Sequence, residues 1–381
     1  MKFSTYRNII YFVLFLLPFE GAAQSTNGSN TNAIPVQVPF LNISPDSRSG
    51  AMGDAGVAIS PDVNANFWNP SKLAFLESND ALSLSYSPWL RHLVPDISLS
   101  YLSYAHKLSD RNTLGASLRY FNYGSIPLTD ISANDLGTYT PNEFSLDATF
   151  ARKFGENLSL GLTMRYIRSN FSNIAFSQGS SQTDKAGNAA AVDVSLYYKK
   201  PYGSDNLFAF GVNVSNIGTK ISYSDVGPSY FLPANLKIGA ANTWNFDETS
   251  QLTVTLDLNK LLVPTNRDSS GVISDVSVPS GIFRSFTDAP GGFKEELKEI
   301  TLSPGAEYWY NQQFAVRAGY FYEAQSKGGR RYLTLGVGMK YDIFNFDFSY
   351  LAASQQNSAL ANTLRFSLSA SFGGTTNVSK R

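Results

Sequence analysis

The chain has 381 residues, a formal net charge of +0 and no cysteine. The zero net charge leaves no electrostatic footprint for nucleic acid, and the lack of thiols excludes disulfides, thiol catalysis, zinc–thiolate sites and a lipoprotein-type lipid anchor. Charged residues make up only 16% whereas aromatic residues reach 14%, and this balance suits β structure with amphipathic rings at a membrane interface.

The N-terminus has the pattern of a secretory signal peptide over residues 1–23. Lys2 and Arg7 form its positively charged part, residues 9–19 form its apolar core, and small residues precede Gln24. The apolar core is too short for a spanning helix, and no later stretch reaches about 18 consecutive apolar residues. We therefore expect an exported protein without a membrane-spanning helix, which for a long, tyrosine-rich chain points to the bacterial outer membrane.

The next part of the chain is rich in glycine, serine and asparagine and fits neither a strand nor a long helix. We predict an N-terminal arm at residues 24–42 and a plug inside a barrel lumen at residues 43–76, because irregular backbone needs surroundings that satisfy its peptide groups. A mobile arm is the alternative. Glycines that permit close backbone approach and a helix-breaking Asn-Pro pair mark the plug: Gly50, Gly53, Asp54, Gly56, Asn69 and Pro70.

From residue 80 onward, apolar and polar residues alternate with a period of two, as in residues 158–166 and 333–341. Many runs extend over about 9–11 residues, enough to cross the hydrocarbon when tilted, whereas strands of a soluble β-sandwich usually have about 5–6. We count about fourteen runs, an even number as in bacterial barrels. The sequence thus predicts an all-β fold, a transmembrane antiparallel β-barrel over residues 80–374, with a tail at 375–381.

Charged residues within the predicted strands fall on the parity opposite to the apolar residues. A Lys or Arg that faces lipid at the midplane costs about 2–4 kcal/mol, so this separation is expected for a lipid-facing wall. We expect the charges to face the lumen and to pair with one another or with the plug residues Asp46, Asp54 and Asp62. The predicted luminal charges are Arg119, Asp147, Arg165, Asp193, Glu307, Arg317, Asp347 and Arg365.

The connections alternate between short turns and long loops, which lie at residues 124–141, 170–187, 216–233 and 264–299. Outer-membrane barrels keep short turns in the periplasm and long loops outside. The first turn, around residues 89–95, belongs to the long-loop side and is here called the first outer loop. The first strand therefore runs outward, and we expect the plug segment to start at the periplasmic end.

The last long loop contains a predicted amphipathic helix on the outer surface. Phe293, Leu297 and Ile300 have helical spacing. This apolar stripe packs either on a neighbouring loop or on a partner, and we favour the loop.

Several irregular stretches resemble a known family. They are SPDSRSGAMGDAGVAISPD, WNPSK, YSPWLRHLVPDISLSYLSY, PNEFSLDA, LDLNKLLVPT, FTDAPGGFKEELKEI and EYWYNQQFAVRAGYFYE, from Ser44 to Glu323. The overall plan resembles FadL-type outer-membrane barrels, and the match is closer to the PorV (LptO) family of the Bacteroidetes type IX secretion system. One departure is the residues that follow Phe372, because barrels often end on an aromatic residue.

The resemblance implies a FadL-like barrel with a non-enzymatic role in protein secretion. Such proteins receive cargo with a C-terminal signal domain from the translocon barrel and deliver it to a surface attachment complex with a PorU-like sortase. Outer-membrane lipid and lipopolysaccharide are further expected partners, and nucleic acid is not. A FadL-like transporter of hydrophobic small molecules and a lipopolysaccharide O-deacylase are the alternatives.

The sequence contains no recognisable catalytic motif around its two histidines. His106 lies near the periplasmic end of a strand, and His92 has neither a G-x-S-x-G nor an H-E-x-x-H context. We expect no catalytic residue, no cofactor and no metal site.

Cargo would have to bind at the outer loops, since the strands face lipid and the lumen is filled. Aromatic and Arg anchors typically dominate binding energy. The predicted contact residues are Trp89, Arg91, His92, Phe286, Phe293 and Leu297, for which packing between loops is the competing explanation.

Overall fold

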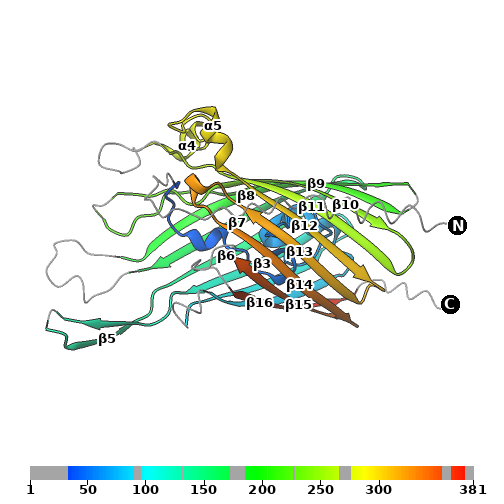
Figure 1. Cartoon of the computed structure of the whole chain (residues 1–381), viewed down its shortest axis with the longest axis horizontal. Coiled ribbons are helices and arrows are strands. Elements are labelled where there is room, and N and C mark those ends of the chain that lie inside the picture. The colour runs from blue at the N-terminus through cyan, green and yellow to red at the C-terminus, as the bar shows by residue number, and fades with distance from the viewer. Residues whose placement is uncertain are drawn as a thin grey trace. The chain divides into compact units, whose positions relative to one another are not determined.

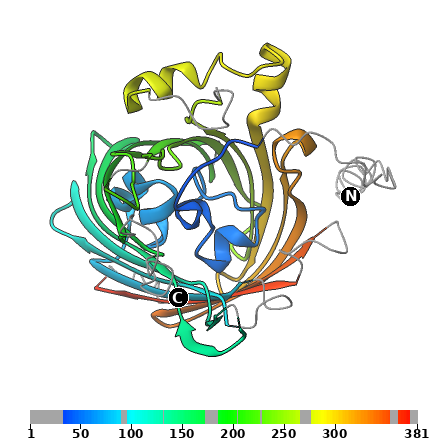
Figure 2. The same ribbon diagram turned by 90° about the vertical axis from the view of Figure 1, so that its left-hand side faces the viewer.

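The computed structural model describes residues 33–89, 96–130, 132–171, 185–203, 205–225, 228–265, 276–353 and 362–373. Within these ranges, fourteen antiparallel strands form one closed barrel (Figures 1 and 2), and a separate two-stranded hairpin accompanies it. No helix in the described part is long and apolar enough to span a membrane. The predicted all-β antiparallel barrel is confirmed.

The barrel follows chain order and closes between its first and last strands, where Asp80 pairs with Phe372 and Tyr86 with Phe366. Its strands are β1 (Asp80–Pro88), β2 (Ser98–Lys107), β3 (Asn112–Asn122), β6 (Asn142–Lys153), β7 (Leu158–Asn170), β8 (Gly187–Tyr202), β9 (Asn206–Gly218), β10 (Asn235–Asn245), β11 (Ser250–Leu261), β12 (Ile300–Tyr310), β13 (Phe314–Tyr322), β14 (Arg331–Tyr341), β15 (Phe344–Ala353) and β16 (Thr363–Phe372). The hairpin consists of β4 (Ile126–Thr129) and β5 (Asp135–Tyr139).

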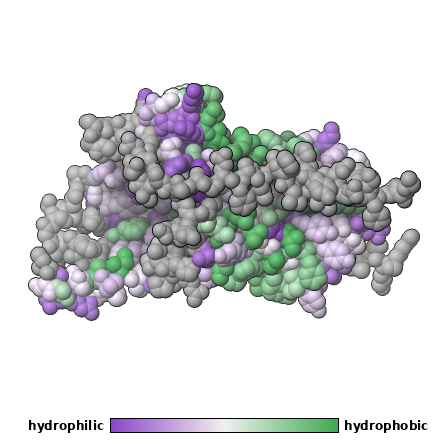
Figure 3. Space-filling view, viewed as in Figure 1, coloured by the Kyte–Doolittle hydropathy of each residue, from purple (hydrophilic) through white to green (hydrophobic). Residues whose placement is uncertain are grey.

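The period-two pattern separates the two faces of each strand. In β7, Leu160, Leu162 and Met164 point outward and are exposed, whereas Thr163 and Arg165 point inward and are buried. Figure 3 shows hydrophobic surface along the barrel wall. An apolar exterior of this kind leaves polar groups to find their partners inside the barrel.

Short helices lie before and between the strands. They are η1 (Pro39–Asn42), α2 (Ser47–Gly50), α3 (Ala65–Trp68), η2 (Pro70–Phe75), α4 (Val278–Arg284), α5 (Phe293–Glu296), η3 (Leu297–Glu299) and η4 (Gln325–Lys327). The helix predicted to run to Ile300 is shorter, because Ile300 already belongs to β12. Its apolar residues Phe293 and Leu297 are exposed, so the favoured packing on a neighbouring loop is wrong.

The direction of the N-terminal segment also differs from the prediction. Val38 and Phe40 pack with Phe121 and Leu232 at the end that carries the long loops. Phe75 instead packs with Tyr197 near the short turns. The described part of the segment therefore runs from the long-loop end toward the short-turn end, because its first apolar residues are buried in a cluster near the long loops.

The lipid-facing wall gives a depth-dependent prediction. We expect Leu256→Lys, in the middle of β11, to lower the free energy of unfolding by about 2–4 kcal/mol, since it places an ammonium at the centre of the bilayer. The matched substitution Tyr341→Lys, at the exposed end of β14, should cost only about 0–1 kcal/mol. Urea titration in lipid vesicles measures both values, and equal costs would contradict a membrane-spanning wall.

Candidate functional site

Residues 38–76, here called the interior segment, lie inside the ring of strands (Figure 2, blue), and most of their side chains are buried. Its short helices are tied together by Asp46, which is fully buried. One carboxylate oxygen of Asp46 accepts from the Ser49 amide at 2.9 Å, and the other accepts from the Trp68 indole at 2.6 Å. Asp46 thus caps α2 and fixes α3 against it.

One ion network joins the interior segment to three strands. Arg48 donates two hydrogen bonds to Glu307 of β12, at 2.9 Å and 2.7 Å, and pairs with Asp62 at 2.9 Å. Glu307 also accepts from Arg317 of β13 at 2.7 Å, and Arg317 donates to Asp347 of β15 at 2.7 Å. The bidentate geometry fixes the orientation of Arg48 as well as its position.

A second group of contacts joins the interior segment to neighbouring strands. Asp54 pairs with Arg365 of β16 at 3.0 Å and accepts from the Tyr332 hydroxyl of β14 at 2.6 Å. The Gly56 amide donates to Asp257 of β11 at 2.7 Å. Charged side chains of the wall therefore satisfy both side chains and peptide groups of the interior segment.

A third network lies on the other side of the lumen. Arg165 pairs with Asp147 at 2.7 Å and with Asp193 at 2.8 Å. Arg119 lies 3.5 Å from Asp147 and donates to the Leu41 carbonyl at 2.8 Å. All eight predicted luminal charges lie in these three groups, and all are buried: Arg119, Asp147, Arg165, Asp193, Glu307, Arg317, Asp347 and Arg365.

The remaining residues singled out in this segment touch the wall or the segment itself. Gly50 faces the Arg365 side chain and Gly56 faces the Trp68 ring. The Asn69 amide group donates to the Val57 and Leu196 carbonyls, both at 3.0 Å, and Pro70 opens η2. Gly53 has a φ of 73° and lies against the backbone of Tyr320.

The six predicted cargo residues divide into two groups. Trp89 is half-buried and packs on the apolar cluster at the long-loop end, and Arg91 and His92 lie outside the described residues. Phe286, Phe293 and Leu297 are exposed on the loop between β11 and β12. The structure does not bring the first group together with the second in any contact among the described residues.

Sequence reasoning missed a buried ion cluster beneath that loop. Lys260, at the end of β11, pairs with Glu296 at 3.0 Å and with Glu299 at 2.6 Å. Lys327 of η4 pairs with Glu299 at 3.0 Å and with Glu295 at 2.6 Å. Burial alone would lower the pKa of Lys327, but the two glutamates raise it above the ordinary value. The spacing of the glutamates was visible in the sequence, but the distant lysines were not.

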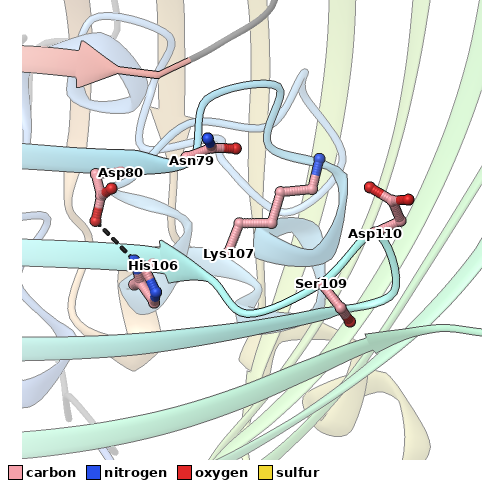
Figure 4. A pocket seen from close by; sticks show the side chains of 6 residues that line it. All are labelled: Asn79, Asp80, His106, Lys107, Ser109 and Asp110. Carbon is pink, nitrogen blue, oxygen red and sulfur yellow. Dashed lines mark hydrogen bonds and ion pairs between the residues drawn. The ribbon is translucent and has the colours of Figure 1, made fainter.

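A shallow pocket lies at the short-turn end (Figure 4), lined by Asn79, Asp80, His106, Lys107, Ser109 and Asp110. Asp80 accepts from the Tyr104 hydroxyl at 2.6 Å and lies 2.8 Å from His106 Nδ1. The Ser109 oxygen accepts from the Asn112 amide at 3.2 Å, and in Figure 4 its side chain points away from His106. In the described ranges, no cluster of His, Asp and Glu could hold a metal ion.

Fourteen strands with an apolar outer face and a polar interior define a transmembrane β-barrel protein. The chain belongs to the family described as "Type IX secretion system protein PorV", which matches residues 26–268. No curated protein matches the sequence.

Solved structures share the fold at low sequence identity. The P. putida toluene transporter TodX is 13% identical, with a TM-score of 0.53, over 86% of this chain and 98% of that chain. The monoaromatic hydrocarbon channel CymD is 14% identical, with a TM-score of 0.51, over 87% and 98%. Identities this low show a common architecture only.

The first ion network predicts how firmly the interior segment is held. We expect Arg317→Ala to loosen residues 43–76 without stopping membrane insertion, because Glu307 and Asp347 lose a shared buried partner, at a cost of about 3–5 kcal/mol. Limited proteolysis of the inserted protein measures the change. Arg152→Ala, at an exposed position, is the control, and unchanged protease sensitivity in Arg317→Ala would count against the network.

The close approach of two backbones gives an independent prediction. A Cβ on Gly319 would lie 2.0 Å from the backbone carbon of Met52 and 2.1 Å from the Gly53 amide nitrogen. Gly319→Ala should therefore displace this turn and break the hydrogen bond from the Gly53 amide to Thr334. Hydrogen exchange at Gly53 should accelerate, whereas the outward-facing Ala318→Val should leave it unchanged; equal protection in both variants would contradict this contact.

Proposed function

We propose that this protein is a non-enzymatic carrier in type IX secretion. It receives cargo proteins with a C-terminal signal domain from the translocon barrel and passes them to the surface attachment complex, which contains a PorU-like sortase. The observation that carries the proposal is the family match over residues 26–268 on a barrel whose interior is occupied. The family match assigns the protein to the type IX secretion system. The transfer of cargo is the step that we propose.

The occupied interior supports a role for the outer end rather than for the lumen. The interior segment acts as a plug in this proposal, since ion pairs such as Arg48–Glu307 and Arg365–Asp54 hold it against several strands. A transporter of hydrophobic molecules would need an apolar path or pocket. The apolar cluster near the long loops is filled by the chain's own Val38, Phe40 and Leu41, which favours the carrier.

The contacts of the described histidine favour a non-enzymatic role over lipopolysaccharide deacylation. His106 lies at the short-turn end beside Asp80, on the side away from lipopolysaccharide, and Ser109 is engaged by a backbone amide. A deacylase would require a base within reach of its nucleophile near the outer rim.

A pull-down from detergent-solubilised outer membranes tests the proposal with the tagged full-length protein. Mass spectrometry should find proteins that share a C-terminal β-sandwich signal domain, together with a large translocon barrel or a sortase-like peptidase. An unrelated tagged barrel from the same membranes is the control. Recovery of the protein alone with bound lipid or hydrocarbon would refute the carrier in favour of the transporter or deacylase.

The first outer loop is the proposed cargo contact, with Trp89, Arg91 and His92. We expect Trp89→Ala to weaken cargo capture by about 2 kcal/mol, the scale of an aromatic anchor. Phe246→Ala removes an exposed ring at the short-turn end and should leave capture unchanged. Equal capture by both variants would remove the first loop from the proposal.

A further inference from the structure

The loop between β11 and β12, here called the fifth outer loop, carries an exposed apolar patch on its described residues 276–299. Phe283 is 77% exposed, Phe293 75%, Leu297 51% and Phe286 45%. These side chains come from α4, from α5 and η3, and from the stretch that joins them. Several exposed apolar side chains gathered on one loop indicate an interaction surface, whereas single ones need no explanation.

Buried ion pairs fix the orientation of this loop. The acidic side of α5 and η3 faces inward, where Glu296 and Glu299 are buried against Lys260 and Lys327. Glu296 also accepts from the Ala289 amide at 2.7 Å. With its glutamates held toward the barrel, the helix must present Phe293 and Leu297 outward. The usual arrangement of an amphipathic surface helix is therefore reversed.

The exposed charges beside the apolar patch are positive. Arg284, Lys294 and Lys298 are exposed, while the glutamates of α5 and η3 pair with Lys260 and Lys327. Aromatic and aliphatic side chains combined with Lys and Arg on one face are typical of helices that lie in the interface of a membrane with anionic lipids.

The loop lies where such an interface would be. Figure 2, a view from the long-loop end, shows α4 and α5 beside the barrel wall rather than over its mouth. In Figure 3, hydrophobic surface near α5 continues onto the wall. The chain passes from η3 directly into β12, so the helix sits where a strand enters the hydrocarbon. The patch is therefore continuous with the surface that faces lipid.

We propose that the fifth outer loop is an interfacial anchor in the outer leaflet. Its apolar side chains enter the boundary between headgroups and acyl chains, and its basic side chains contact lipid phosphate groups. The charge of the loop and its continuity with the lipid-facing wall favour lipid over a protein partner. The apolar residues are Phe283, Phe286, Phe293 and Leu297, and the basic residues are Arg284, Lys294 and Lys298.

The absence of cysteine from the sequence allows a direct depth measurement. The full-length variant Phe293→Cys is labelled with a nitroxide and inserted into vesicles of phosphatidylethanolamine and phosphatidylglycerol. The accessibility of the nitroxide to oxygen is compared with its accessibility to an aqueous nickel complex, which is present on both sides of the vesicle membrane. We expect a depth of about 5–10 Å below the headgroup boundary. Leu256→Cys on the wall gives the lipid reference, and Glu248→Cys in an exposed turn gives the aqueous reference.

Leu297→Cys repeats the measurement if a label at residue 293 disturbs the loop. Adding Lys294→Glu and Lys298→Glu should make either label shallower in these vesicles and leave its depth unchanged in neutral phosphatidylcholine. Labels that match Glu248→Cys in every vesicle would overturn the proposal. So would labels that stay aqueous in vesicles and become shielded only when an outer-membrane protein extract is added, because the patch would then bind protein.

Discussion

The structure depends on the exclusion of charge from the outer face of the barrel. Since the lipid side of each strand accepts only apolar groups, every ionised side chain of the strand centres has to be compensated inside. The wall alone does not achieve this: Glu307 is shared between Arg317 and Arg48, and Arg365 finds its carboxylate on Asp54. The interior segment is therefore an electrostatic component of the barrel, and the barrel supplies the polar surroundings that its irregular backbone requires.

A lumen held in this way has consequences for function. Buried ion pairs contribute little net stability when complete but cost several kcal/mol when one member is removed, roughly 3–5 kcal/mol. Withdrawing the interior segment would break Arg48–Glu307 and Arg365–Asp54 together. A protein with so costly an opening is better suited to act at its rim than through its interior, which agrees with a carrier in secretion.

Much of the fold could be predicted because both faces of a strand are recorded locally in the sequence. The parity of Arg165 and Asp193 identified the lumen side without any knowledge of their partners. Contacts between distant segments left no such record. In the sequence, Lys260 is only the end of a predicted strand, and its pairing with Glu299 becomes visible only in the structure. The burial of Val38 and Phe40 near the long loops depends on an apolar cluster built from several strands and loops. The orientation of α5 was missed for the same reason: its spacing defined two faces, but only the buried lysines decide which one turns inward.

The same lysines connect the barrel to the proposed anchor. Lys260 ends a membrane strand and Lys327 belongs to the next outer loop, so the pairs that hold Glu296 and Glu299 set the helix against two parts of the rim at once. An anchor fixed in this way would restrict the tilt of the barrel as well as its depth, because it extends the lipid contact to one side of the wall. For a carrier, a fixed tilt would hold the first outer loop at a constant height above the membrane. Cargo that passes from one membrane-embedded partner to another would then meet the same surface in each encounter. The orientation of the carrier would be fixed before cargo binds, so binding would not have to impose it.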